Sequence, residues 1–300
     1  MKLLSFQYEG KTLFGPKVKR EEAVWDLLAL AKHYDEKEFP QTIIEGIASG
    51  LDFVEKIRKL VERARQDDAN SFKYLFTEIE WLAPIPRTPK NVICVGKNYL
   101  DHAQEMGDNQ APEKLMIFTK SPTSIAADEE DLPIHHALTE QMDYEGELAV
   151  VISKEGRNIP KQLAYDHIFG YTIANDITAR DIQAERGQFF LGKSLDRTCP
   201  MGPYIVTKNE IPEPNKLSVV TKVNDDVRQN GNTSSMIYQV DELIAEISRF
   251  VTLEPGDVIL TETPAGVGKG MTPPSYLRAG DTVKISIEGI GTLSNSFVKE

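Results

Sequence analysis

The stretch that most constrains this chain runs from Asp143 to Ile152, and it reads Asp-Tyr-Glu-Gly-Glu followed by Leu-Ala-Val-Val-Ile. The unbroken apolar run, rich in β-branched residues, predicts a buried strand. Side chains two positions apart on a strand share a face, so Glu145 and Glu147 should point the same way, about 7 Å apart. Two like charges at that separation repel by about 2 kcal/mol at an effective dielectric constant near 20. The pattern therefore favours a bound cation, and a solvated strand face is the alternative that composition alone does not exclude.

A second acidic strand is predicted over residues 170–181, where Asp176 ends another apolar run. If this strand lies beside the first, Asp176 adds a third carboxylate to Glu145 and Glu147. Three hard oxygen donors with room for water suit Mg²⁺ or Mn²⁺ better than zinc. The sequence thus offers Glu145, Glu147 and Asp176 as candidate metal ligands.

Composition sets the broad class. The 300 residues allow one large domain or a domain with an appendage. The formal charge is 34 − 46 = −12, and no Lys/Arg-rich run is present, which argues against nucleic acid as a partner. No run of about 18 apolar residues and no signal-peptide pattern occur, so we expect no membrane association and a cytoplasmic location. Cys94 and Cys199 are too few for a disulfide framework or a zinc site.

The chain divides near residue 85 in our interpretation. Prolines at positions 84, 86 and 89 preclude regular structure there. Residues 1–85 carry no recognisable chemistry, and we expect an accessory domain that packs against the rest of the protein and covers it. Its expected elements are a hairpin that turns at Glu9-Gly10, helices at 21–34, 43–48 and 51–65, and a strand at 78–82. Residues 86–300 are expected to form the second, larger domain.

His102 and Glu105 form a candidate acid–base pair after a predicted buried strand at 91–96. Residues three apart on a helical turn lie on one face within hydrogen-bonding reach. A carboxylate that holds an imidazole is the usual arrangement of a general base that deprotonates water. Taken alone, the same spacing fits a capped surface helix better.

Six short motifs, in order and at the right spacings, resemble those of the fumarylacetoacetate hydrolase family over about residues 86–300. The N-terminal part resembles that of a bacterial branch that includes an oxaloacetate decarboxylase. The resemblance implies an α+β fold, with a mixed β-roll and a small N-terminal α+β domain, and usually a homodimer. It also implies that Glu145, Glu147 and Asp176 hold the metal. The motifs are Val95-Gly96-Lys97-Asn98-Tyr99-x-x-His102-x-x-Glu105-Met106, Phe118-x-Lys120-Ser121-Pro122, Asp143-Tyr144-Glu145-x-Glu147, Asn175-Asp176-x-Thr178-Ala179-Arg180-Asp181, Gly192-Lys193-Ser194 and Thr263-Pro264-Ala265-Gly266-Val267-Gly268.

The resemblance also assigns roles. Lys193 is similar to the family's active-site lysine, whose ammonium would offset negative charge on a bound substrate. The segment Gly266–Gly270 is expected to let a backbone approach the ligand closely. Many family members have glycine where this chain has Glu262, which adds bulk and negative charge near the site. The residues expected to face the substrate are Gly96, Asn98, Tyr99, Arg180, Gln183 and Thr263, with a structural ion pair as the alternative role for Arg180.

The expected chemistry follows from a metal that binds a 2-oxo acid through its carboxylate and keto oxygens. Such a metal acts as a Lewis acid and lowers the energy of an enolate at C3. We expect decarboxylation of oxaloacetate to pyruvate through that metal-bound enolate, because the branch resemblance favours it. Acylpyruvate hydrolysis of the fumarylpyruvate or acetylpyruvate type is the first alternative, with His102 and Glu105 generating hydroxide, and hydroxymuconate-type isomerisation is the second. A non-enzymatic, partner-binding role is less favoured because His102, Glu105, Lys193 and the three carboxylates are all present.

Overall fold

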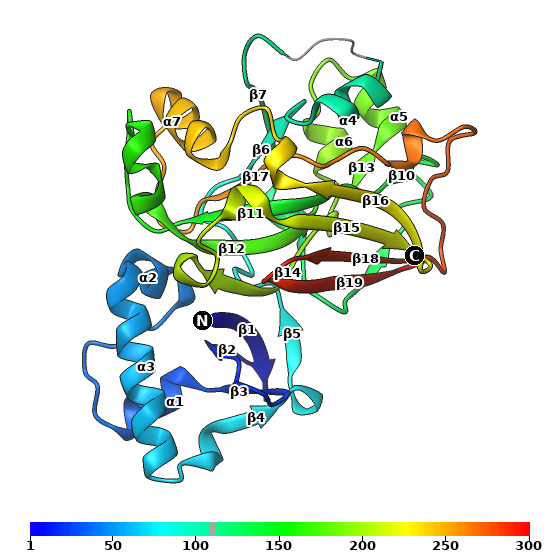
Figure 1. Ribbon diagram of the computed structural model, residues 1–300. Helices are drawn as coiled ribbons and strands as arrows, with labels where there is room; N and C mark the ends of the chain where they lie inside the picture. Colours follow the sequence, from blue (N-terminus) through cyan, green and yellow to red (C-terminus); the bar gives the residue numbers. More distant parts are fainter. Residues whose placement is uncertain (108–111) are drawn as a thin grey trace.

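The computed structural model describes residues 1–107 and 112–300, and a ten-stranded mixed sheet forms its centre (Figure 1). The strand order is β2-β1-β14-β12-β11-β17-β6-β7, while β5 pairs with β1 and β8 pairs with β14. Most neighbours are antiparallel, but β17 and β6 are parallel, as are β14 and β8. The strands are β1 (Lys2–Tyr8), β2 (Lys11–Pro16), β5 (Glu80–Leu82), β6 (Val92–Gly96), β7 (Met116–Lys120), β8 (Ile125–Ala126), β11 (Gly146–Ile152), β12 (Ile168–Asn175), β14 (Cys199–Thr207) and β17 (Val258–Leu260).

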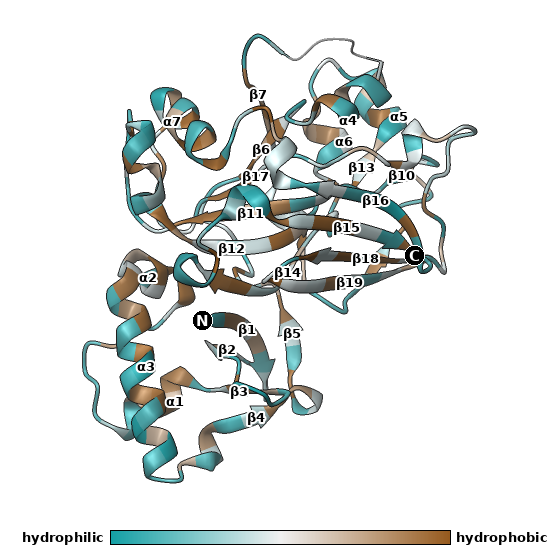
Figure 2. Ribbon diagram, viewed as in Figure 1, coloured by the Kyte–Doolittle hydropathy of each residue, from teal (hydrophilic) through white to brown (hydrophobic). Residues whose placement is uncertain are grey.

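A five-stranded sheet packs against one face of the central sheet, with β15 near β11 and β18 near β12. Apolar side chains that alternate along these strands meet between the layers, among them Leu148, Ile173, Val219 and Ile285. Figure 2 shows the hydrophobic colouring of these inner strands. The second sheet has the order β16-β15-β18-β19-β9, and its strands are β9 (Asp131–Pro133), β15 (Ser218–Val223), β16 (Asp226–Asn232), β18 (Thr282–Ile287) and β19 (Gly291–Val298). The expectation of a mixed α+β fold is confirmed, and the sheets do not close into a barrel.

Three N-terminal helices cover the opposite face of the central sheet (Figure 1). They are α1 (Leu27–His33), α2 (Ile43–Ala48) and α3 (Gly50–Gln66). Phe53 and Ile57 from α3 share one apolar cluster with Val151 of β11 and Phe169 of β12. The predicted hairpin is present, and its strand β1 pairs with β14, so the central sheet extends across the predicted boundary at residue 85. That boundary stays a prediction.

The expected helix over 21–34 is wrong in its first part. A short strand, β3 (Ala23–Trp25), pairs with β4 (Lys73–Leu75), and the helix begins only at Leu27. Asp26 sets this start because its side chain accepts the backbone N–H of Ala29 at 2.9 Å. An aspartate that caps in this way satisfies an otherwise unpaired donor of the first turn.

Short elements gather over one end of the central sheet, where β11 begins and β12 ends (Figure 1). They are α4 (Leu100–Glu105), α5 (Arg180–Glu185), α6 (Phe190–Lys193), and the paired strands β10 (Met142–Asp143) and β13 (Thr178–Ala179). The longer α7 (Val240–Phe250) lies apart from this group.

The strand expected from Asp143 to Ile152 is interrupted at Tyr144 and Glu145, which lie between β10 and β11. Within the described residues, no helix is long and apolar enough to span a membrane.

Candidate active site

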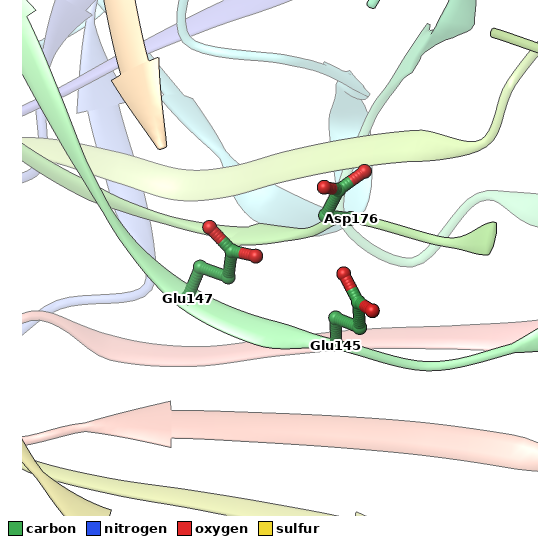
Figure 3. Close-up of side chains that lie close together, drawn as sticks. All are labelled: Glu145, Glu147 and Asp176. Carbon is green, nitrogen blue, oxygen red and sulfur yellow. The ribbon is translucent and has the colours of Figure 1, made fainter. Parts of the chain in front are cut away.

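Three carboxylates converge at the ends of two paired strands (Figure 3). Gly146 of β11 lies opposite Asn175 of β12, which brings the residues on either side of that pair together. The backbone N–H of Asp176 donates to the Glu145 carbonyl at 2.9 Å, and the Glu145 N–H donates to Asn175 Oδ1 at 2.9 Å. One carboxylate oxygen each from Glu145, Glu147 and Asp176 lies within 4.8 Å of the others. All three side chains are buried, and the structure brings together the predicted ligand set.

The charges in this cluster are unevenly compensated. Burial opposes ionisation of Glu145, but Lys193 and Arg180 outweigh it and lower the pKa of this carboxyl to about 2. Burial, together with the charges of Asp176 and Glu145, raises the pKa of Glu147 well above its usual range. Among the described residues, no basic side chain forms an ion pair with Glu147; it accepts the Glu262 backbone N–H at 2.8 Å instead. A buried carboxylate in this position is stabilised by an added cation.

The donor set fits a divalent metal ion. All three donors are hard carboxylate oxygens, the ligand type that Mg²⁺ and Mn²⁺ prefer. A bound cation would remove the repulsion that disfavours ionised Glu147 beside Glu145 and Asp176. The choice between Mg²⁺ and Mn²⁺ stays a prediction.

Two buried lysines hold Asp176. Lys193 Nζ lies 2.7 Å from Asp176 Oδ2 and 2.5 Å from Glu145 Oε2. Lys120 Nζ lies 2.8 Å from Asp176 Oδ1 and donates to the Ile177 carbonyl at 2.9 Å. Lys120 stands within one of the sequence motifs, yet sequence reasoning gave it no role. Its fully buried position at the end of β7 becomes informative only once the sheet is assembled.

We expect Lys193→Met to lower the free energy of unfolding of the metal-free protein by about 3–5 kcal/mol, because it leaves buried charges unpaired. Saturating Mn²⁺ should recover part of this loss by neutralising the same carboxylates. Denaturant unfolding with and without Mn²⁺ measures both effects. Lys284→Met removes a half-exposed lysine near Asp225 and should change stability by less than about 0.5 kcal/mol. A Lys193→Met protein as stable as the control would contradict this account.

Arg180 is at once an ion-pair partner and part of the cavity wall. Its guanidinium contacts Asp143 Oδ2 at 2.8 Å and Glu145 Oε1 at 2.7 Å, and it donates to Gln183 Oε1 at 3.3 Å. Asp143 also accepts the backbone N–H groups of Gly268 at 2.7 Å and Lys269 at 3.0 Å. Asp143 thereby joins Arg180 to the glycine-rich segment, a role that sequence reasoning missed.

A cavity of about 250 Å³ opens onto this cluster. Of the predicted residues, Gly96, His102, Glu145, Arg180, Gln183 and Lys193 line it. The rest of the lining combines apolar side chains with Glu262 and two further lysines, and it comprises Lys97, Ala103, Met106, Met116, Phe118, Ala184, Phe189, Glu262 and Lys269.

His102 and Glu105 lie on one helical turn, as predicted, and His102 is buried at the cavity wall. Its Nδ1 is 3.2 Å from Glu105 Oε2, and its Nε2 is 3.5 Å from Glu262 Oε1. Burial lowers the pKa of His102, but Glu105 and Glu262 outweigh it, so the pKa is raised. Burial raises the pKa of Glu262 to about 7. These features favour a buried acid–base group over a capped surface helix.

The glycine-rich segment binds the Glu105 carboxylate, whereas the sequence predicted that its backbone would approach a ligand. The Gly266 N–H lies 3.0 and 3.1 Å from the two Glu105 carboxylate oxygens. A Cβ at Gly270 would lie 2.2 Å from that carboxyl group, so a larger residue there would displace the Glu105 side chain.

Three residues expected at the substrate are engaged elsewhere in the fold. The Asn98 side chain donates to the carbonyls of Tyr238 and Thr261 at 3.0 and 3.1 Å. Thr263 donates to the Gly146 carbonyl at 3.0 Å. Tyr99 is buried and borders a separate hollow. The structure does not bring Asn98, Tyr99 and Thr263 into the cavity lining, and their contact with substrate stays a prediction.

A buried carboxylate cluster beside a small cavity, with a histidine–carboxylate pair on the wall, is the type of site that metal-assisted enzymes use. Residues 91–298 match the family model described as fumarylacetoacetate (FAA) hydrolase C-terminal. The chain belongs to the fumarylacetoacetate hydrolase family.

Similar proteins cover the whole chain. An uncharacterized protein from Staphylococcus aureus strain USA300 is 52% identical, with all of both chains covered. A solved fumarylacetoacetate hydrolase from Exiguobacterium antarcticum is 41% identical with a TM-score of 0.82, again over all of both chains. A solved 5-carboxymethyl-2-hydroxymuconate delta-isomerase from Mycobacterium smegmatis is 32% identical with a TM-score of 0.74, over 100% of this chain and 99% of that one. The predicted family and fold are confirmed, while the homodimer stays a prediction.

Proposed function

We propose that the protein cleaves a carbon–carbon bond of a small 2-oxo acid, and that decarboxylation of oxaloacetate is its preferred reaction. The carrying observation is the 250 Å³ cavity in which Lys193 and Arg180 stand beside the carboxylate cluster. Its small volume suits a four-carbon skeleton, and its cationic groups suit an anionic ligand. A divalent cation held by Glu145, Glu147 and Asp176 would supply Lewis-acid polarisation of the 2-oxo acid.

The cationic side chains bind and orient the anion. Lys193 and Arg180 are both buried, so their charges act in a medium of low dielectric constant and are little screened by water. When the C3–C4 bond of oxaloacetate breaks, its electron pair stays on the pyruvate fragment as an enolate and CO2 departs. Preorganised positive charge from Lys193 and Arg180 stabilises that developing anion.

His102 then supplies a proton. The pyruvate enolate needs one proton at C3 to become pyruvate. Glu105 fixes Nδ1 of His102, which leaves Nε2 directed toward Glu262 and the cavity. The raised pKa of His102 favours the imidazolium form, which is a proton donor.

Acylpyruvate hydrolysis is the second candidate, and the His102–Glu105 pair favours it. In that reaction neutral His102 takes a proton from water, and the resulting hydroxide attacks the C4 carbonyl. The C3–C4 bond then breaks, which releases a carboxylic acid and the pyruvate enolate. The similarity to a protein named as a fumarylacetoacetate hydrolase also supports a hydrolytic reaction.

A panel of 2-oxo acids assayed with Mn²⁺, with Mg²⁺ and with chelator tests the proposal. We expect faster pyruvate release from oxaloacetate than from acetylpyruvate, and reversible loss of both activities with chelator. Robust acetylpyruvate hydrolysis with oxaloacetate untouched would contradict the decarboxylase proposal and favour the second candidate. Isomerisation of a hydroxymuconate-type acid without pyruvate release would contradict both.

A further inference from the structure

Glu262 occupies a backbone conformation that favours glycine. It follows β17 and has φ of +85°, in the left-handed region that L-residues rarely adopt. Its backbone N–H donates to Glu147 Oε2 at 2.8 Å. That hydrogen bond is open to glycine too, so it does not explain why a glutamate stands here.

The contacts of the Glu262 side chain explain better why a glutamate occupies this position. Glu262 is 7% exposed and lines the cavity. Its Oε2 accepts the Asn98 backbone N–H at 3.3 Å, and its Oε1 faces His102 Nε2 at 3.5 Å. A buried carboxylate on an uncommon backbone conformation is doubly costly, and such features concentrate at functional sites.

We propose that Glu262 is a specificity-determining residue whose side chain closes the His102 end of the cavity. Short 2-oxo acids then fit, while those with a longer acyl group meet the Glu262 carboxylate. The inference rests on the proposed function for the class of ligand, but it does not depend on which bond is cleaved. Removing the side chain at position 262 would open space beside His102 and would leave the side chains of Glu145, Glu147 and Asp176 in place.

Ligand binding tests this inference without turnover. Calorimetry with Mn²⁺ compares oxalate, a short mimic of the 2-oxo acid head, with 4-phenyl-2,4-dioxobutanoate, which carries the same head and a long distal group. We expect Glu262→Gly to bind the long compound at least about tenfold more tightly than the wild type, since apolar groups of this size change affinity on that scale. Oxalate affinity should change by less than about threefold, because oxalate does not extend to position 262.

Two matched variants make the outcome decisive. Glu262→Gln keeps the bulk without the charge, and it should exclude the long compound as the wild type does. Glu262→Asn shortens the side chain at a φ that asparagine tolerates, and it should show a smaller gain than glycine. Thermal unfolding should find Glu262→Gly at least as stable as the wild type, because the backbone constraint is relieved.

Unchanged affinity for the long compound in both Glu262→Gly and Glu262→Asn would overturn the inference. An equal gain in Glu262→Gln would also overturn it, since bulk would then not be the cause. If the binding contrast appears but the wild type releases no pyruvate from oxaloacetate, the proposed reaction fails while the role of Glu262 stands.

Discussion

Glu147→Gln is expected to lower turnover by at least about 10²-fold, because Lewis-acid assistance contributes several kcal/mol to the barrier and each 1.4 kcal/mol is a factor of ten. The metal-free variant should nevertheless be at least as stable as the wild type. Burial and the neighbouring Asp176 and Glu145 disfavour ionised Glu147, and the amide removes that charge while keeping the shape. Opposite effects on activity and on metal-free stability would separate a metal ligand from a residue that only supports the fold.

Activity assays and thermal unfolding with and without Mn²⁺ measure both effects. Wild-type protein should gain stability with Mn²⁺ in proportion to metal occupancy, whereas Glu147→Gln should gain little. Glu288→Gln is the matched control, since Glu288 is exposed in the turn between β18 and β19 of the five-stranded sheet. Wild-type activity in the Glu147→Gln variant would contradict the metal site. Full activity of the wild-type protein in metal-free buffer would contradict it as well.

His102→Ala is expected to lower acetylpyruvate hydrolysis by about 10²–10⁴-fold, the usual range for a positioned general base. Hydrolysis requires the imidazole to take a proton from water. Oxaloacetate decarboxylation needs no attacking water, so it should lose less, through slower protonation of the enolate or weaker substrate affinity. The variant therefore separates the two candidate reactions by the ratio of their losses.

Steady-state kinetics with both substrates measures that ratio. His136→Ala is the control, because His136 is exposed in a loop away from the cavity. Equal losses on the two substrates would mean that His102 serves a step common to both. A decarboxylation loss greater than the hydrolysis loss would contradict the division of roles.

The carboxylate cluster could be predicted because its signal is local. Two glutamates at strand spacing must share a face, and an aspartate at the end of the next strand can join them by simple pairing. The His102–Glu105 pair is likewise fixed by one helical turn. Such patterns depend on backbone geometry alone, and the structure retains them even where the strand is interrupted at Glu145.

Other parts of the site depend on contacts that no local pattern encodes. Asn98 looks like a substrate ligand in its motif, yet it bridges two segments more than 130 residues away along the chain. Lys120 pairs with Asp176 only because β7 and the end of β12 meet in space. The start of α1 at Leu27 is predictable from the sequence, since an aspartate before an apolar run, here Asp26, often caps a helix.

The central claim is that Glu145, Glu147 and Asp176 jointly hold one divalent metal ion at the cavity. Anomalous diffraction from crystals grown with Mn²⁺ and oxalate tests it most directly. We expect a single Mn²⁺ peak enclosed by these three carboxylates, with oxalate completing its coordination on the side of Lys193 and Arg180. A Mn²⁺ peak elsewhere, or three carboxylates that remain metal-free at saturating Mn²⁺, would contradict the claim.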